Sequence, residues 1–390
     1  MFTETAPPAP SATIFSRKNP FPAKLLTRRR LDGAGSEKET YHYEFSLEQS
    51  GLAFEVGDSL GVFPANAPEL VDEILTLLGF SGRELVSGAS GESISVRDAL
   101  LRERTITTPS RQFVQMVSER IAAARFLLEY CDTSQRAKLE SYLWGRHVVD
   151  FLIEYPELRN KMSPQELVAS LSKLQPRLYS IASSLNRYPE AAHLLVTNVG
   201  FISYGRSRKG VCTSFLAERI EEAVRVPVFI HTAKHFRLPA DPAASIIMIG
   251  VGTGLAPFRA YLQEREAIGA TGRNWLFFGE QHRAANFYHE KEWAAYTSSG
   301  LLTRLDTAFS RDQSQKIYVQ HRLREAGREI WSWLQEGAYL YLCGDAERMA
   351  PDVDAALCAI AEEQGAMSKE AAAEYLGSLR TQKRYRRDVY

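Results

Sequence analysis

The chain has 390 residues, of which 45% are hydrophobic and 24% charged, values typical of a soluble globular protein of roughly two or three domains. Lysine plus arginine and aspartate plus glutamate number 47 each, so no whole-molecule attraction to nucleic acid or acidic lipid is expected. The four cysteines (Cys131, Cys212, Cys343 and Cys358) have no CxxC spacing. We therefore predict no disulfide scaffold, no metal site and a reducing, cytoplasmic location.

The first 20 residues carry prolines and Glu4 but no apolar run, so they predict a disordered arm rather than a secretory signal. The most apolar stretch, Ile246–Phe258, is interrupted by glycines and a proline. It is shorter than the roughly 18–20 apolar residues of a membrane span, and no membrane span is predicted.

Residues 21–241 contain short runs of sequence that are typical of β-strands. Tyr41–Leu47 alternates with period two, as in a strand that has one buried face. Further strands are predicted at Arg177–Ser183, His193–Val199 and Val226–His231, and a helix at Ser214–Val224. Turn signals between the runs favour a sheet or barrel.

An interval of about residues 66–172 changes to a helical period. Apolar residues recur from Leu70 to Leu78 at helical spacing and stop at Gly79. Phe113–Glu119, Ala122–Tyr130 and Arg136–Tyr142 also favour helix. We predict a helical insertion within the β domain.

The last part of the chain, residues 242–390, alternates strands with helices. Ile246–Gly250 and Trp275–Gly279 are continuous apolar runs, with a helix predicted between them at Pro257–Ile268. Such strands are typical of a parallel sheet covered on both faces, here a doubly wound α/β domain. Additional strands are predicted at Leu302–Phe309, Ile317–Gln320 and Ala338–Cys343.

A glycine-rich loop, Gly250–Pro257, lies directly between a predicted strand and a predicted helix. Glycines let the backbone approach a pyrophosphate closely, and the helix N-terminus supplies unpaired N–H donors. The loop is not a GxGxxG motif, because Pro257 occupies the third glycine position. A tight turn without a ligand is the alternative interpretation.

A polar, basic cluster lies later in the same domain, and in a doubly wound sheet it belongs to the edge that carries the glycine loop. Two cations, hydroxyls and an amide suit a ribose phosphate, although a solvated basic loop remains an alternative. The cluster consists of Ser310, Arg311, Lys316, Tyr318 and Gln320.

Three further segments combine polar or aromatic residues with loops or chain ends. Arg177–Ser184 places Tyr179 and Arg177 on one face of a strand, suited to a flat cofactor or to an ordinary edge strand. Gly205–Ser214 is a basic loop before a predicted helix, whose N-cap is Thr213 or Ser214. The loop is either a binding site for a pyrophosphate or an ordinary N-cap. Arg384–Tyr390 ends the chain and is either frayed or functional.

Taken in order, these motifs resemble the FAD/NADPH-binding half of the diflavin reductases, a branch of the ferredoxin–NADP reductase superfamily that includes cytochrome P450 reductase. The chain is most similar to the NADPH-sulfite reductase flavoprotein alpha subunit. The resemblance covers about residues 21–390 and implies an FAD-binding β-barrel domain (21–241) with a helical connecting insertion, then an NADP-binding domain (242–390). The motifs that carry it are Arg177–Ser184, Gly210–Leu216, Ile247–Arg259, Trp275–Gly279, Ser310–Gln320, Cys343–Asp345 and Arg384–Tyr390.

The resemblance also implies roles for individual residues. The FAD contacts are Arg177, Tyr179 and Ser180, with the FAD pyrophosphate at Gly210, Val211, Cys212, Thr213 and Ser214. Tyr390 covers the second flavin face and moves aside for nicotinamide. The NADPH contacts are Gly252, Thr253 and Gly254 at the pyrophosphate, the Ser310–Gln320 cluster at the 2′-phosphate, and Asp352. The polar group around the hydride path is Ser180, Cys343 and Asp388.

The chain departs from the family in two places. Only about 20 residues precede the match, whereas an FMN-binding flavodoxin domain commonly needs about 100 or more. We therefore expect electrons to pass from FAD to a separate flavodoxin, ferredoxin or sulfite reductase hemoprotein. Phe201 stands near the position of a family tyrosine that contacts the FAD phosphate, and Tyr204 is a candidate substitute.

The resemblance implies an NADPH-dependent FAD flavoprotein reductase, with a sulfite reductase flavoprotein component as its best-matching role. One alternative is a general NADPH–flavodoxin or ferredoxin reductase similar to cytochrome P450 reductase. A second alternative, from a different class, is a flavin-binding scaffold without catalysis.

Overall fold

The computed structural model describes residues 15–221 and 224–390, and residues 1–14 of the predicted arm lie outside this part of the chain. Phe15–Pro20 make a turn closed by reciprocal backbone hydrogen bonds between Ser16 and Asn19. The chain divides into two compact units: unit 1 holds residues 1–61, 178–197 and 222–390, and unit 2 holds residues 62–177 and 198–221. Across the described residues, every helix is too short or too polar to cross a bilayer.

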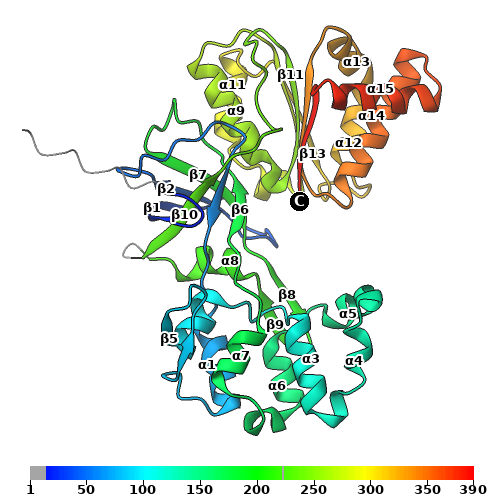
Figure 1. The fold of residues 1–390 in the computed structure, drawn as a ribbon. Helices are drawn as coiled ribbons and strands as arrows, with labels where there is room; N and C mark the ends of the chain where they lie inside the picture. The colour runs from blue at the N-terminus through cyan, green and yellow to red at the C-terminus, as the bar shows by residue number, and fades with distance from the viewer. Residues whose placement is uncertain (1–14, 222–223) are drawn as a thin grey trace, which may run out of the picture. The chain divides into compact units, whose positions relative to one another are not determined.

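Unit 1 contains a six-stranded sheet with the order β6-β3-β10-β1-β2-β7 (Figure 1). β1 pairs antiparallel with both β10 and β2, and β2 pairs antiparallel with β7. Closure of this sheet into a barrel stays a prediction. The strands are β1 (Phe21–Arg30), β2 (Thr40–Ser46), β3 (Ser59–Val62), β6 (Arg177–Ser180), β7 (Ala191–Thr197) and β10 (Arg225–His231).

The second sheet of unit 1 has five strands in the order β13-β12-β11-β14-β15, and all its neighbours run parallel. The predicted parallel sheet is thereby confirmed, and the last residues form its edge strand instead of a frayed tail. The strands are β11 (Ile246–Val251), β12 (Asn274–Glu280), β13 (Arg304–Phe309), β14 (Tyr339–Gly344) and β15 (Tyr385–Val389).

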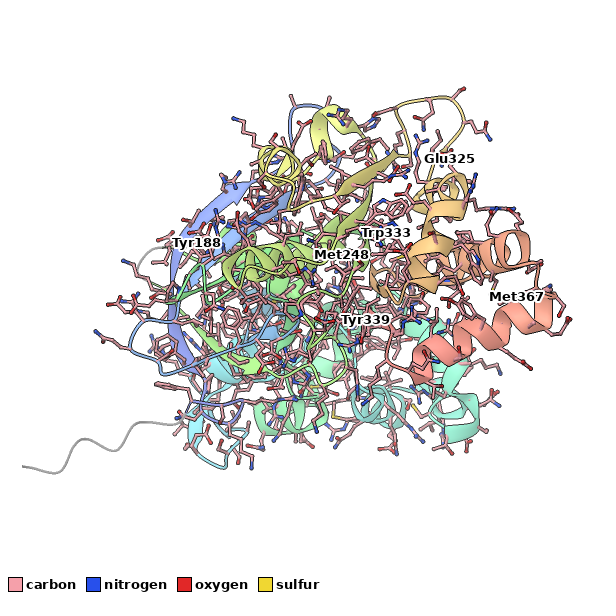
Figure 2. All side chains as sticks on the ribbon, turned by 90° about the horizontal axis from the view of Figure 1, so that it is seen from above. Tyr188, Met248, Glu325, Trp333, Tyr339 and Met367 are labelled. Atoms are coloured by element: carbon pink, nitrogen blue, oxygen red, sulfur yellow. The ribbon has the colours of Figure 1, made fainter. Side chains whose placement is uncertain are left out.

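Helices cover both faces of the parallel sheet. Alternate residues of β11 point to opposite sides: Ile247 and Ile249 join one core, and Ile246 and Met248 the other (Figure 2 labels Met248). α12–α15 pack on the first side, whereas α9 and α11 pack on the second. The helices are α9 (Ala256–Ala267), α10 (Arg283–Asn286), α11 (Glu290–Ser298), α12 (Val319–Glu325), α13 (Gly327–Gln335), α14 (Met349–Gly365) and α15 (Lys369–Thr381).

Unit 2 is mostly helical and has a continuous apolar core of its own, and the bounds of the predicted insertion stay a prediction. It also contains two hairpins, β4 (Leu85–Ser87) with β5 (Ser93–Ser95) and β8 (Gly200–Ser203) with β9 (Arg206–Lys209). The helices are α1 (Pro68–Leu78), α2 (Val96–Asp98), α3 (Arg111–Arg120), α4 (Leu127–Tyr130), α5 (Arg136–Leu143), α6 (Val148–Glu154), α7 (Pro164–Ser170) and α8 (Val211–Ser214).

Two predicted elements differ from the structure. The helix predicted at Ser214–Val224 begins at Val211 and continues as a π-helical turn to Arg219, because the buried Ile220 is already extended. The strand predicted at Ile317–Gln320 is instead the start of α12. Val319 and Leu323, four residues apart, are both buried there, so a helical period overrides the short alternation that favoured a strand.

Candidate functional site

The order of the parallel sheet reverses between β11 and β14, and ligands of doubly wound folds bind at such a reversal. The glycine loop leaves β11 here as a 3₁₀ turn, Gly252–Leu255, and continues into α9. A Cβ on Gly254 would overlap the Cys343 carbonyl of β14, so only glycine permits this close packing. The loop predicted from the sequence therefore lies where a dinucleotide is expected.

The three residues predicted to surround the hydride path meet at the same edge of the sheet. Ser180 Oγ donates a hydrogen bond to Asp388 Oδ2 at 2.7 Å, and Cys343 Sγ lies 3.9 Å from the same oxygen. Burial raises the pKa of the Cys343 thiol, and the nearby Asp388 carboxylate raises it further. The thiol is consequently protonated at neutral pH and can donate to Asp388.

Tyr390 is held at the end of β15. Its N–H donates to the Gly344 carbonyl at 3.1 Å, its carbonyl accepts from the Ala346 N–H at 3.0 Å, and its hydroxyl lies 3.1 Å from Thr253 Oγ1. The side chain is nevertheless 65% exposed. The aromatic ring is thus exposed, on a backbone that is held by two hydrogen bonds, and its hydroxyl makes one contact to the glycine loop.

Tyr179 and Ser180 are the half-buried end of β6, and Arg177 at its start is exposed. The Ser180–Asp388 hydrogen bond brings this strand end to the last strand of the chain across 208 positions. Arg177 Nη1 donates to the Gln175 carbonyl at 2.8 Å, within its own loop.

A cavity of about 370 Å³ follows the carboxyl ends of the parallel strands. Ser310, Tyr318, Gln320 and Asp352, all predicted to contact NADPH, line it together. Gln320 Nε2 donates to Asp352 Oδ2 at 3.0 Å, which orients the amide.

The two predicted cations of the phosphate cluster are exposed and do not line this cavity. Arg311 Nη1 instead pairs with Glu37 Oε2 at 2.6 Å, and this ion pair lowers the pKa of the Glu37 carboxyl. Since exposed ion pairs contribute about 0–1 kcal/mol, Arg311 can exchange this partner for a phosphate at low cost.

Two cations of the cavity were missed by sequence reasoning. Lys38 Nζ lies 2.7 Å from both carboxylate oxygens of Glu280, and Arg348 lines the wall beside Asp345. Lys38 comes from the β1–β2 connection, 242 positions before Glu280. No local pattern signals a partner that distant.

The predicted FAD pyrophosphate segment, Gly210–Ser214, lies in unit 2 and forms the turn into α8. Gly210 is the N-cap, which corrects the expected Thr213 or Ser214 cap. The Thr213 hydroxyl accepts from the Val199 N–H at 3.2 Å and donates to the Gly210 carbonyl at 3.3 Å. Val211 and Ser214 line a cavity of about 550 Å³ in this unit, whereas the predicted contact Cys212 is buried.

The basic residues of the predicted loop before α8 form strand β9 and are paired within unit 2. Arg206 binds Glu73, Arg208 binds Asp150 in a buried pair, and Lys209 binds Glu218. Each of these cations has an acidic partner that is distant in sequence or in the next helical turn, which no local pattern in the sequence predicted. Arg219, half-buried in the turn that follows α8, donates to Ser214 Oγ at 3.2 Å and was not predicted.

Phe201 and Tyr204 have different surroundings in unit 2. Phe201 lines a cavity of about 830 Å³ and lies 6.3 Å from the Trp144 ring. The Arg146 guanidinium lies over the Tyr204 ring, with its Cζ 4.4 Å from the ring centre. Which of the two replaces the family tyrosine stays a prediction.

Comparison with known proteins identifies both halves of the chain. Residues 13–215 match the family described as FAD binding domain, which is more than half of the chain. This chain belongs to that FAD-binding family. Residues 248–355 match the oxidoreductase NAD-binding domain.

Similar curated proteins are named sulfite reductase [NADPH] flavoprotein alpha-component. The Bacillus subtilis (strain 168) protein is 42% identical over 99% of this chain and 64% of its own length. The Shewanella sp. (strain MR-7) protein is 45% identical over 98% of this chain and 63% of its own length, and that of Vibrio vulnificus (strain CMCP6) is 43% identical over 97% and 60%. The chain thus spans somewhat under two thirds of these relatives.

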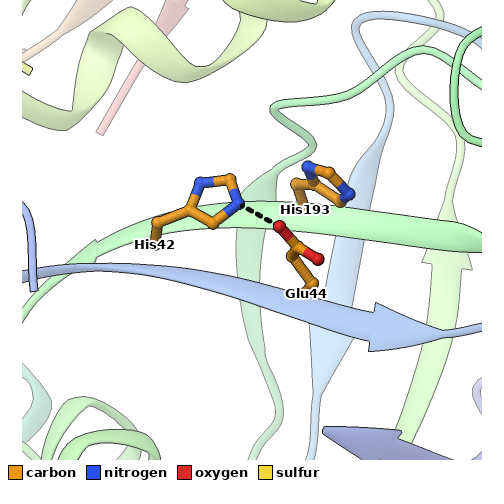
Figure 3. A group of neighbouring side chains, drawn as sticks. All are labelled: His42, Glu44 and His193. Atoms are coloured by element: carbon orange, nitrogen blue, oxygen red, sulfur yellow. Dashed lines mark hydrogen bonds and ion pairs between the residues drawn. The ribbon is translucent and has the colours of Figure 1, made fainter. Parts of the chain in front are cut away.

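A cluster with two buried histidines, which the sequence did not predict, lies on strands β2 and β7 of the six-stranded sheet. His42, Glu44 and His193 place one potential ligand atom each within 4.8 Å of one another (Figure 3). His42 Nε2 lies 3.1 Å from Glu44 Oε1, and the His42 ring centre lies 5.0 Å from that of His193 and 5.3 Å from that of His289. Burial, followed by the positive charge of Arg259, lowers the pKa of His42 to about 2 and that of His193 to about 3.

This cluster predicts a pH dependence of stability. Between pH 6.5, the ordinary pKa of His42, and its folded pKa of about 2, the unfolded ring binds a proton and the folded ring does not. Stability therefore falls below pH 6.5, by about 1.4 kcal/mol per pH unit for this ring, and the penalty is absent at pH 7. Calorimetry at pH 5.5 in buffers of different ionisation enthalpy measures the number of protons taken up on unfolding. We expect His42→Gln to take up about one proton fewer than the wild-type protein.

The exposed His235 supplies the control, since His235→Gln leaves the buried cluster intact. Equal proton uptake by wild type and His42→Gln would show that the folded His42 ring is already protonated at pH 5.5.

Proposed function

We propose that this chain is an NADPH-dependent FAD flavoprotein reductase that passes electrons to a separate acceptor, as a sulfite reductase flavoprotein component. The observation that carries the proposal is the Ser180–Asp388 hydrogen bond with Cys343 beside it. It joins the end of β6, in the six-stranded sheet, to β15 at the edge of the parallel sheet, next to β14 and the reversal point, where we expect the donor and the acceptor of hydride to meet.

The residues fit the two cofactors. Gly254 has no room for a side chain because it packs against the Cys343 carbonyl, which holds the glycine loop at the carboxyl ends of the parallel strands, and Ser310, Tyr318 and Gln320 supply polar groups around one cavity. The chemistry supplied by bound FAD is acceptance of a hydride and release of electrons one at a time. The proposed task of this chain is to orient the nicotinamide and to exclude water from the Ser180–Asp388 group.

Asp388 has the proposed role of stabilising the positive charge that develops on the nicotinamide ring as its hydride leaves. Ser180 and the Cys343 thiol orient the carboxylate through their hydrogen bonds. Tyr390 has the proposed role of covering the flavin until nicotinamide displaces its ring. Gly210–Ser214 stay predicted to hold the FAD pyrophosphate.

The acceptor follows from the names of the relatives, which are flavoprotein components of a sulfite reductase. A sulfite reductase hemoprotein, a flavodoxin and a ferredoxin are the candidate acceptors. We expect NADPH-dependent reduction of at least one of these by the FAD-loaded chain, with ferricyanide as a small oxidant that needs no docking surface. Ferricyanide reduction without reduction of any of the three proteins would contradict transfer to a separate acceptor of these classes.

Replacing the terminal tyrosine should relax the preference for NADPH. In Tyr390→Ser the ring no longer competes with nicotinamide, and loss of an aromatic stack is equivalent to about 2–10-fold in binding. We expect kcat/KM for NADH to rise by about that factor. Tyr390→Phe, which removes only the hydroxyl contact to Thr253, should behave nearly as wild type. Unchanged NADH kinetics in Tyr390→Ser would count against stacking.

A further inference from the structure

Arg259 is a buried charge that the proposed chemistry does not use. It is the fourth residue of α9, directly after the glycine turn, and only 3% of it is exposed. Its Nε and Nη2 donate to the two carboxylate oxygens of Glu292 on α11, at 2.7 and 3.0 Å. Its Nη1 donates to the Ala182 carbonyl at 2.7 Å.

Ala182 follows Ser180 by two positions, so the contact reaches the segment that carries the predicted flavin residues. The backbone of this segment is tied to its own sheet, because the Ala182 N–H donates to the His193 carbonyl at 2.8 Å. α9 contacts the segment again further along: Gln263 Oε1 accepts from the Ser184 N–H at 3.1 Å, and Glu264 Oε1 accepts from Asn186 at 2.8 Å. Arg259 is the contact nearest to both the glycine loop and Ser180.

The Arg259 guanidinium also determines which nitrogen of His193 carries the proton. Arg259 Nη1 lies 3.3 Å from His193 Nδ1, and since arginine only donates, this nitrogen accepts. A neutral His193 then carries its proton on Nε2 and has no second lone pair for a metal. A guanidinium at this distance also repels a bound cation. His193 therefore serves as a hydrogen-bond acceptor for Arg259 rather than as a metal ligand.

Lysine cannot replace this arginine. The fork of the guanidinium satisfies Glu292 with two parallel bonds and still reaches Ala182 with its third nitrogen. His289 Nδ1 contacts Glu292 Oε1 at 2.9 Å and fixes the carboxylate from the other side.

We propose that Arg259 is a positioning residue, which sets the glycine loop of β11–α9 against the Tyr179–Ser180 strand end and thereby the gap that the hydride crosses. This inference rests on the proposed function. A displacement of about 1 Å at a reacting centre can slow a reaction by about 100-fold without a matching loss of binding.

The test compares Arg259→Lys with Arg265→Lys. Arg265 lies on the same helix and is 1% exposed, but it donates to the carbonyls of Pro242, Ala244 and Gly272, all within the dinucleotide domain. We expect Arg259→Lys to lower the single-turnover rate of flavin reduction by about 10–100-fold, with the Kd of NADP⁺ changed by less than about threefold. It should also weaken the long-wavelength charge-transfer absorbance and the hydrogen-exchange protection of residues 182–187. Arg265→Lys should leave all four unchanged.

Equal effects of the two variants, or an unaltered rate in Arg259→Lys, would overturn the proposal. If Arg259→Lys does not fold, Glu292→Gln weakens the same fork at constant volume and carries the same expectation. Flavin that NADPH does not reduce in the wild-type protein would refute the proposed function, whereas hydrogen exchange would still test the contact itself. Stoichiometric zinc in the purified protein, lost in His42→Gln, would contradict the assignment of the cluster.

Discussion

Removing the carboxylate in Asp388→Ala should lower the rate constant of flavin reduction by NADPH by about 100-fold or more. Asp388 Oδ2 receives both the Ser180 hydroxyl and the Cys343 thiol, so its loss removes the negative charge and releases both donors. Positioned acid–base and electrostatic groups typically contribute 10²–10⁴-fold, as an order of magnitude. Anaerobic stopped-flow absorbance at saturating NADPH measures this rate constant directly.

Since the group acts as a unit, Ser180→Ala in the Asp388→Ala background should cost little more, and the two effects should be far from additive. Asp354→Asn is the matched control. Asp354 lies on α14 and accepts hydrogen bonds from Tyr385 and Arg387, which are on the same strand as Asp388, at 2.7 and 3.0 Å. Its described interactions do not include Ser180 or Cys343. If Asp354→Asn lost as much rate as Asp388→Ala, the effect would come from a displaced strand β15 and not from the missing Asp388 carboxylate.

The sequence predicted the framework of this site better than its connections. The strand, glycine loop and helix at Ile246–Ile268 follow from continuous apolar residues and from glycine and proline positions, which are local signals. The meeting of Ser180 with Asp388 spans 208 positions and was expected only through resemblance to a family. Arg259 ends the motif Ile247–Arg259, but the helical periodicity of the sequence does not predict that this charged residue is buried against Glu292.

The largest effect on substrate choice is expected from Arg311→Ala combined with Lys316→Ala. Each charge-assisted bond to a phosphate contributes about 1.5–3 kcal/mol, so KM for NADPH should rise by about 100-fold or more. KM for NADH should stay within about twofold, because NADH has no 2′-phosphate. Steady-state kinetics with both nucleotides and one shared acceptor provide the comparison.

Arg324→Ala removes another exposed cation, this one from α12, where Arg324 pairs with Glu363 at 2.8 Å. It should leave both KM values unchanged, which separates a specific contact from a loss of overall charge. If KM for NADH and NADPH rose together in the double variant, the phosphate pocket would be wrongly placed.

Glu37 offers an independent check on this pocket. It holds Arg311 in an exposed ion pair, so Glu37→Ala frees the guanidinium and should leave NADPH binding unchanged or slightly tighter. The sequence predicted Ser310, Tyr318 and Gln320 as neighbours, and they do line one cavity. It did not predict Lys38 or Arg348, because the first lies in the loop between β1 and β2, far away in the sequence, and the second is the residue before α14, where an arginine is ordinarily solvated.

The central claim is that this chain takes a hydride from NADPH onto FAD. Anaerobic mixing of the FAD-loaded protein with one equivalent of NADPH, followed by visible absorbance, tests it most directly. We expect loss of the oxidised flavin band within a single turnover, and slower loss with NADH. An oxidised spectrum that persists while NADP⁺ binding is demonstrated separately would contradict it and identify a flavin-binding scaffold.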